Sequence, residues 1–274
     1  MTYRSTVSEV RLLFFATDEN RRPVPDLQGN DFAVVDDERV IRDFRSFAPI
    51  TSTKVDLMIL LDNSESVGAR FHEEIKVVEE LLPRSTSNSN DNFSVLSFSG
   101  METHFICASD CGEALARDKL NSITPRGSTP LFDALKLAAS VLIQHRQTDV
   151  LPVILLFSDG EDTISRASFD EAVQKILASG ALIYAIDFAD PGGPSNGSAI
   201  LRTLADDSGG RTISLESGAE GISSQIDADF RAAYVVTYAS PATSSEFHSV
   251  GVFPTRNLNL RLRSRCGYYH SHAP

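Results

Sequence analysis

Apolar and polar positions divide the chain into a middle part and two ends. Between residues 51 and 232, nearly continuous apolar runs alternate with stretches in which apolar residues recur at helical spacing. Continuous apolar runs are typical of strands buried on both faces, as the strands of a parallel sheet between two layers of helices are. The runs begin at Val55, Phe93, Leu151, Ala181 and Arg211.

Three apolar stripes between these runs predict helices. They consist of Val67, Phe71, Ile75, Val78 and Leu82; of Leu131, Leu135, Ala138 and Leu142; and of Phe169, Val173, Ile176 and Leu177. Helices are expected to stop at Gly180 and at Gly209 and Gly210, because glycine adopts a left-handed C-terminal cap without strain. Residues 101–108 predict a short edge strand that pairs with the run before it. The alternation indicates a doubly wound, mostly parallel α/β domain over residues 51–232.

The two ends of the chain have a different pattern. Residues 1–50 and 233–274 alternate apolar and polar positions over short stretches separated by turn residues, without a helical stripe. Each end offers about three or four strands, which is marginal for a stable sheet. We therefore expect the two ends to pair into one small β-sandwich, with the α/β domain inserted between them.

Composition narrows the classes of partner. The formal net charge is −12, and no cluster of Lys and Arg is dense enough to follow a phosphate backbone, so nucleic-acid binding is not expected. No apolar run approaches the roughly 20 residues of a membrane-spanning helix. The first residues lack the apolar core of a signal peptide, which leaves two alternatives: a cytoplasmic protein, or the mature form of an exported protein whose leader has been removed.

The three cysteines decide little. Cys107 and Cys111 are close enough in sequence to form a disulfide across a loop, or they are free thiols, and Cys266 stands alone. A zinc site would need more ligands nearby than this segment offers.

Oxygen-bearing side chains occur at three of the predicted strand and helix ends. Asp62-Asn63-Ser64-Glu65-Ser66 follows the first run, Thr129 comes directly before a helix that Pro130 starts, and Asp159 follows the third run. Ligands of doubly wound sheets bind outside the carboxyl ends of the strands. Two carboxylates and three hydroxyls at that edge suit a hard divalent cation, which prefers oxygen ligands. Taken singly, Thr129 is also an ordinary helix cap, and Asp159 with Gly160 an ordinary turn.

The set Asp62-x-Ser64-x-Ser66, Thr129 and Asp159 resembles the metal-ion-dependent adhesion site of von Willebrand factor type A domains. The resemblance covers the order, the strand contexts and the separations over residues 51–232. The flanking segments are similar to those of a bacterial group of VWFA-related proteins, whose members are typically exported, so a secreted or periplasmic location is expected.

The resemblance implies a role for each of these residues. Ser64, Ser66 and Thr129 would contact the cation through their hydroxyls, and Asp62 and Asp159 would hold it largely through bound water, or one of them directly. Mg²⁺ is the expected ion, with Mn²⁺ or Ca²⁺ able to substitute. Uncharged direct ligands leave the ion electron-poor, so it still attracts a carboxylate from a protein partner.

Three acidic residues near this set need separate interpretations. Glu65 occupies a position that is often glycine in the family, where it faces solvent or lends a carboxylate to the ion. Asp133 falls in the first turn of its helix, where a negative charge complements the helix dipole. Glu161 is a further nearby acid with no assigned role.

The expected function is a metal-dependent, adhesion-type protein–protein interaction module. One alternative is a structural domain whose residues do not bind metal. An enzyme is the other, but the sequence has no G-x-S-x-G elbow, no phosphate-binding G-x-x-x-x-G-K-[ST] loop and no convincing histidine base. The absence of a general base argues against catalysis.

Overall fold

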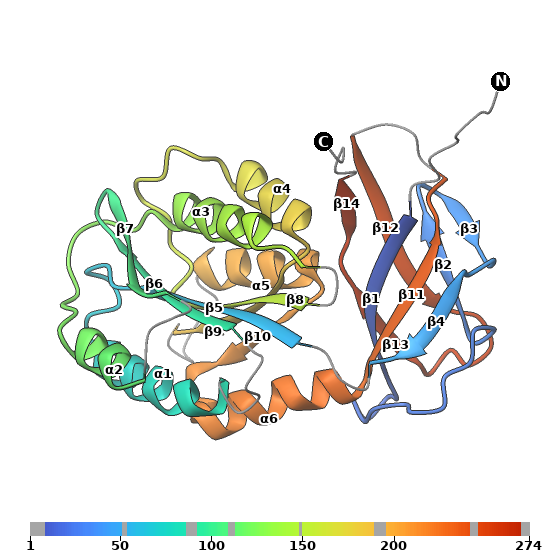
Figure 1. Cartoon of the computed structure of the whole chain (residues 1–274), viewed down its shortest axis with the longest axis horizontal. Helices are drawn as coiled ribbons and strands as arrows, with labels where there is room; N and C mark the ends of the chain where they lie inside the picture. Colours follow the sequence, from blue (N-terminus) through green and yellow to red (C-terminus); the bar gives the residue numbers. More distant parts are fainter. Residues whose placement is uncertain are drawn as a thin grey trace. The chain divides into compact units, whose positions relative to one another are not determined.

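The computed structural model describes residues 9–50, 54–85, 92–108, 113–147, 150–188, 196–241 and 246–269. The chain forms two compact units, one of residues 53–224 and one that combines residues 1–52 with residues 225–274. The predicted fold class is confirmed: a mostly parallel sheet with helices is inserted between strands that form antiparallel sheets (Figure 1). No helix among the described residues is long and apolar enough to cross a membrane.

The α/β unit is built on a six-stranded sheet with the order β10-β9-β8-β5-β6-β7. Its strands are β5 (Lys54–Asp62), β6 (Asn92–Ser99), β7 (Glu102–Cys107), β8 (Val150–Ser158), β9 (Leu182–Asp187) and β10 (Arg211–Ser214). Neighbouring strands are parallel except β7, which is antiparallel to β6 at the edge of the sheet. All five predicted runs and the predicted edge strand are therefore confirmed.

Helices cover both faces of this sheet, with α3 and α4 on one side and α1 and α2 on the other (Figure 1). The helices are α1 (Phe71–Ser85), α2 (Glu113–Asn121), α3 (Leu131–Gln144), α4 (Phe169–Ser179), α5 (Asn196–Ser208) and α6 (Gly218–Arg231). The three predicted stripes fall in α1, α3 and α4, except that Val67 lies in the turn before α1. Gly180 caps α4 in the left-handed conformation, and α5 ends directly before Gly209, both as predicted.

The β unit consists of two four-stranded antiparallel sheets, ordered β13-β1-β11-β4 and β14-β12-β2-β3. Its strands are β1 (Glu9–Thr17), β2 (Phe32–Asp36), β3 (Arg39–Ile41), β4 (Ser46–Pro49), β11 (Ala233–Ala239), β12 (Phe247–Pro254), β13 (Arg261–Ser264) and β14 (Gly267–Tyr269). Each sheet contains strands from both ends of the chain, because β1 pairs with β11 and β2 pairs with β12. Strands β4 and β11, which lead into and out of the inserted unit, are also neighbours, and the Ile50 amide donates to the Ala233 carbonyl.

An aromatic cluster fills the space between these two sheets. The rings of Phe14 and Phe32 lie 4.9 Å apart, and that of Phe47 lies 5.3 Å from Tyr234. These side chains come from β1, β2, β4 and β11, so the core needs residues from both ends of the chain. Every second residue of β1 is buried, which explains the period-two pattern of the end segments.

A buried polar network lies in the same core. Asp36 is fully buried, and its Oδ2 atom accepts hydrogen bonds from the hydroxyls of Tyr238 (2.7 Å) and Tyr268 (2.9 Å). Next to it, the carboxylate of Asp37 contacts Nδ1 of His248 at 2.5 Å.

Of the predicted alternatives for Cys107, the free thiol is wrong, because Cys107 is disulfide-bonded. Cys111 lies outside the described residues.

Candidate metal centre

The predicted site residues lie where the strand order of the α/β unit reverses. From β5 the chain first passes to β6 on one side and later, through α3, to β8 on the other side. Asp62 is the last residue of β5, and Asp159 directly follows β8. The crevice at such a switch point is where doubly wound sheets bind ligands, so the two carboxylates flank a position suited to a site.

Asp62 is held by hydrogen bonds to both of its carboxylate oxygens. Oδ1 accepts from the Ser64 amide at 2.9 Å, and Oδ2 accepts from the Ser158 hydroxyl at 2.7 Å. The side chain is completely buried. Burial raises the pKa of Asp62 to about 6, and the charge of Asp159 acts in the same direction, while the hydrogen bonds from Ser64 and Ser158 oppose this rise. The carboxyl is therefore fixed in orientation, and no cationic side chain of the described residues is bonded to it.

The two serines of the first loop place their hydroxyls side by side. The Oγ atoms of Ser64 and Ser66 are 3.1 Å apart, with Ser64 buried and Ser66 exposed. Glu65 between them is exposed, which agrees with the solvent-facing interpretation. Its backbone is not among those with positive φ, so the departure from glycine causes no strain there. The Glu65 amide donates to the Gly127 carbonyl at 3.0 Å, which ties this loop to the one before Thr129.

Thr129 is buried and joined to the third loop by two hydrogen bonds. Its amide donates to the Thr163 hydroxyl (2.8 Å), and the Thr163 amide donates to the Thr129 carbonyl (2.9 Å). The N-cap residue of α3 is Pro130, without a side-chain cap. The interpretation of Thr129 as the helix cap is therefore wrong.

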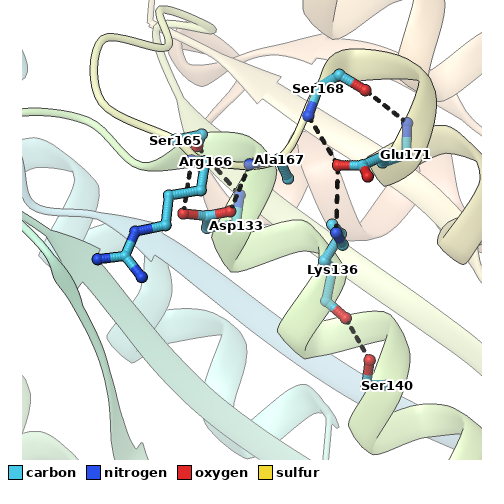
Figure 2. Close-up of polar contacts among 8 residues, drawn as sticks. All are labelled: Asp133, Lys136, Ser140, Ser165, Arg166, Ala167, Ser168 and Glu171. Carbon is cyan, nitrogen blue, oxygen red and sulfur yellow. Dashed lines mark hydrogen bonds and ion pairs between the residues drawn. The ribbon is translucent and has the colours of Figure 1, made fainter.

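The third loop supplies the missing cap of α3 instead. The amide of Phe132 donates to Asp162 Oδ1, and that of Asp133 donates to Ser165 Oγ, both at 3.1 Å. In return, the Asp133 carboxylate accepts from the amides of Arg166 (3.0 Å) and Ala167 (2.9 Å) (Figure 2). Asp133 lies in the first turn of the helix, as predicted, but its contacts reach across the fold and fix the loop that carries Asp159.

Asp159 and Gly160 form a tight turn against the start of α5. Gly160 has a φ of +79°, and a Cβ atom there would lie 2.2 Å from the Gly197 carbonyl oxygen, so only glycine fits. The half-buried Asp159 accepts a hydrogen bond from the Glu161 amide at 3.0 Å. Glu161 itself is exposed. The turn interpretation thus describes the backbone, and it is compatible with a ligand role for the carboxylate.

The donor set fits a hard divalent cation in composition. Within the described residues, no three side chains of the types His, Cys, Asp and Glu lie close enough to hold a metal by themselves. A cation here would therefore need the hydroxyls of Ser64, Ser66 and Thr129. In the described part of the chain, buried side-chain oxygens without a hydrogen-bond partner include Oδ1 of Asn63 and both Oε atoms of Glu74 in the α/β unit; Oδ1 of Asp36 and Oγ1 of Thr212 are further examples. Such unpartnered buried atoms are rare in native proteins, and a bound water molecule or ion is a usual partner for them.

Sequence reasoning missed Ser158 and Glu74. Ser158 is the last residue of a predicted strand, and its position in an apolar run gives no sign that its hydroxyl bonds to Asp62. Glu74 lies three residues after Phe71, so it is on the buried face of α1, where an acidic residue interrupts the apolar stripe. That interruption was the available signal.

Comparison with known sequences supports the resemblance. Residues 56–227, well over half of the chain, match the von Willebrand factor type A domain. The magnesium-chelatase 60 kDa subunit of Cereibacter sphaeroides is 29% identical over 164 residues, which are 56% of this chain and 29% of that subunit. The chain thus spans less than a third of this relative's length.

Solved structures share the fold. A von Willebrand factor type A structure from Catenulispora acidiphila has a TM-score of 0.55 at 12% identity, covering 95% of this chain and 73% of that one. Proximal thread matrix protein 1 from the mussel byssus, in a form with a zinc-occupied MIDAS motif, has a TM-score of 0.52 at 18% identity. The match covers 65% of this chain and 48% of that one. At these identities the likeness concerns the fold alone.

Proposed function

Since the chain belongs to the von Willebrand factor type A family, we propose that its α/β unit is a metal-dependent protein-binding module. Asp62, Ser64, Ser66, Thr129 and Asp159 would hold one divalent cation at the switch point of the sheet. Mg²⁺ is the expected ion, and Mn²⁺ or Ca²⁺ would substitute. A partner protein would supply an Asp or Glu carboxylate.

The observation that carries this proposal is the arrangement around Asp62. A buried carboxyl is fixed by Ser64 and Ser158, has no cationic partner in the contacts described above, and lies beside two adjacent hydroxyls. Burial of a carboxylate without a counter-charge is unfavourable, and a bound cation would compensate it. In the structural alternative, a domain that binds no metal, nothing would offset the cost of burying the Asp62 carboxylate.

The chain's own residues would prepare the site as follows. Ser64 and Thr129 offer buried hydroxyls, Ser66 offers one at the surface, and the Asp133 contacts hold the third loop in place. Neutral hydroxyl ligands would leave most of the ion's charge available as a Lewis acid for a partner's carboxylate oxygen. Because the chain carries a net charge of −12, it would otherwise repel an acidic partner, so this attraction should matter most at low ionic strength.

The loops around the site would choose the partner by shape. They are residues 124–130, 159–165 and 190–198, of which 190–195 lie outside the described residues. Arg126 and the 41% exposed Ile164 lie in the first two loops. Together they offer one cationic and one apolar contact near the proposed carboxylate position, as interfaces with a charged rim and an apolar centre do.

We do not propose catalysis. A serine nucleophile requires an adjacent base, whereas His72, His104 and His145 lie at exposed positions of α1, of β7 and at the end of α3. We propose that the module acts after export, in keeping with the similarity of its flanking segments to exported bacterial proteins.

A pull-down from the native source, run with Mg²⁺ and with EDTA, tests the proposal. Specific partners should be retained with Mg²⁺ and lost with EDTA or in Thr129→Ala. Thr124→Ala, an exposed threonine of the same loop, is the matched control and should retain them. Partners that survive both EDTA and Thr129→Ala would bind another face, and the ion would then be structural at most.

A further inference from the structure

Glu74 is a buried acidic residue that the protein-binding proposal does not use. It lies in the first turn of α1, and it is 0% exposed. Neither carboxylate oxygen has a hydrogen-bond partner within the described part of the chain. Its neighbour Glu73 is exposed and lies 3.6 Å from Arg70. Two adjacent glutamates thus have opposite environments.

The surroundings of Glu74 are negative. Burial, followed by the charges of Asp62 and Asp159, raises the pKa of Glu74 well above its usual range. Arg70, one turn earlier, directs its guanidinium elsewhere: Nη1 donates to the Phe188 carbonyl at 2.9 Å, and Nη2 lies 4.0 Å from Glu216. The carboxyls of the proposed site are therefore the charged groups that act on Glu74.

An apolar residue would fill this position at lower free energy. An unpaired carboxyl in an apolar environment destabilises a fold, and replacing a buried polar group with an apolar one of similar shape is often neutral or stabilising. The apolar stripe of α1 continues on either side, with Phe71 and Ile75 both buried. Positions that break a local rule in this way without a local gain are expected at functional sites.

We propose that Glu74, whose buried carboxylate oxygens have no partner among the described residues, is the third carboxylate of the cation site and acts on the ion through bound water. This inference rests on the proposed function. Because no three acidic side chains of the described residues converge closely enough to bind metal directly, Glu74 belongs outside the inner ligands. The buried, unpartnered Oδ1 of Asn63, next to Asp62, is a second acceptor for such water.

This placement separates two properties of the site. Negative charge from outer groups strengthens cation binding. The inner ligands stay mostly uncharged hydroxyls, so an open position for a partner's carboxylate is kept. Glu74 would thus set how tightly the ion is held without occupying the place where the partner binds.

Isothermal titration of the full chain with Mn²⁺ tests this role. The variant Glu74→Gln keeps the shape and removes the charge, and it should bind Mn²⁺ about 10- to 100-fold more weakly, the range seen when outer partners of metal ligands are removed. Glu73→Gln makes the same charge change at an exposed position of the same turn and should bind like the wild type. Asp62→Ala should bind Mn²⁺ about 100-fold or more weakly.

Thermal unfolding in EDTA distinguishes this role from a structural one. Glu74→Gln and Glu74→Leu should unfold at the same temperature as the wild type or higher, and added Mn²⁺ should raise their midpoint less. A marked loss of stability of both variants in EDTA would overturn the inference, because Glu74 would then be structural. If Glu74→Gln binds Mn²⁺ with wild-type affinity while Asp62→Ala binds it weakly, the role of Glu74 is overturned and the proposed cation site stands. A wild type that binds no Mn²⁺ would overturn the proposed function as well.

Discussion

Asp36 of the β unit and Glu74 of the α/β unit are both fully buried acidic residues, and their hydrogen bonding differs. In the β unit, one oxygen of Asp36 accepts hydrogen bonds from Tyr238 and Tyr268, which come from two different strands. In the α/β unit, the carboxylate of Glu74 has no hydrogen-bond partner within the described residues, and the charges of Asp62 and Asp159 act on it. The first arrangement fixes how strands pack, whereas the second stabilises nothing by itself.

The difference indicates how function can be located in a fold. A buried polar group with partners contributes to a unique packing, so Asp36 is explained by the structure around it. A buried polar group without partners requires something that the chain does not contain. Within the described residues, Glu74 is such a group, since neither of its carboxylate oxygens has a partner, whereas Asp36 lacks a partner at Oδ1 only and has two donors at Oδ2.

The largest expected effect comes from breaking the β unit. Ending the chain after Thr237 removes the last two residues of β11 and all of β12, β13 and β14, so one sheet loses β12 and β14 and the other loses β13. Residues 9–50 should then be digested by protease at least about tenfold faster, because their apolar faces lose their cover. Limited proteolysis with mass spectrometry measures this. A chain ending after Tyr269 is the control, and unchanged resistance of the shorter chain would show that the N-terminal strands fold without the C-terminal ones.

The next effect concerns the site in the α/β unit. Asp62→Ala should weaken Mg²⁺ binding by about 100-fold or more, since it removes the buried carboxyl at the centre of the donor set. Isothermal titration measures the affinity. Asp56→Ala changes an acidic residue near the start of the same strand and should bind normally. Equal binding by the wild type and Asp62→Ala would place the site elsewhere.

The two units should also respond to pH in opposite directions in the absence of cations. The pKa of Asp62 rises from 3.8 to about 6 on folding, so its contribution to stability is complete below pH 4 and is lost as the pH rises through 6. The loss is roughly 2–3 kcal/mol. The pKa of Asp37 is lowered, first by its hydrogen bond with His248, so its contribution is present above pH 4 and is lost on further acidification.

Amide hydrogen exchange in EDTA, corrected for the intrinsic rate, resolves these trends by segment. Strands β5 and β8 should gain protection between pH 7.5 and 4.5, and Asp62→Asn should reduce the gain. The same pH profile in both units would contradict the assignment.

The smallest expected effect is on the tyrosine contacts of Asp36. Tyr238→Phe keeps the ring and removes one of the two donors to a buried carboxylate, which should cost about 1–3 kcal/mol of unfolding free energy. Urea unfolding measures the change, and the double variant with Tyr268→Phe should lose more than either single variant. A neutral Tyr238→Phe would mean that Asp36 is no better supported than Glu74, and the contrast between the units would disappear.

Local patterns were sufficient to predict the sheet, whereas the metal site stays a prediction. Buried parallel strands are continuous apolar runs, and Asp62 and Asp159 directly follow two of them, so a topological rule predicted that they would meet. The capping of α3 was not predictable, because Asp162 and Ser165 are about 30 residues away in the sequence. Helix α2 was missed because its nine residues carry only a weak apolar stripe.

Glu74 shows a different limit of sequence reasoning. In an apolar stripe, an acidic residue is usually attributed to the helix's solvent-facing side, and burial became evident only when α1 packed against the sheet. The sequence shows an acidic residue at position 74, but it does not show that its carboxylate has no hydrogen-bond partner among the described residues.

The adjacency of β4 and β11 has a mechanical consequence. The inserted α/β unit begins after one of these strands and ends before the other, and the Ile50 amide is bonded to the Ala233 carbonyl. Tension applied through whatever precedes Glu9 and follows Tyr269 therefore enters the β unit and crosses its interstrand hydrogen bonds first. The inserted unit bears no tension until β4 separates from β11. In a molecule pulled at both ends, the β unit would therefore carry the force and the proposed cation site would keep its geometry.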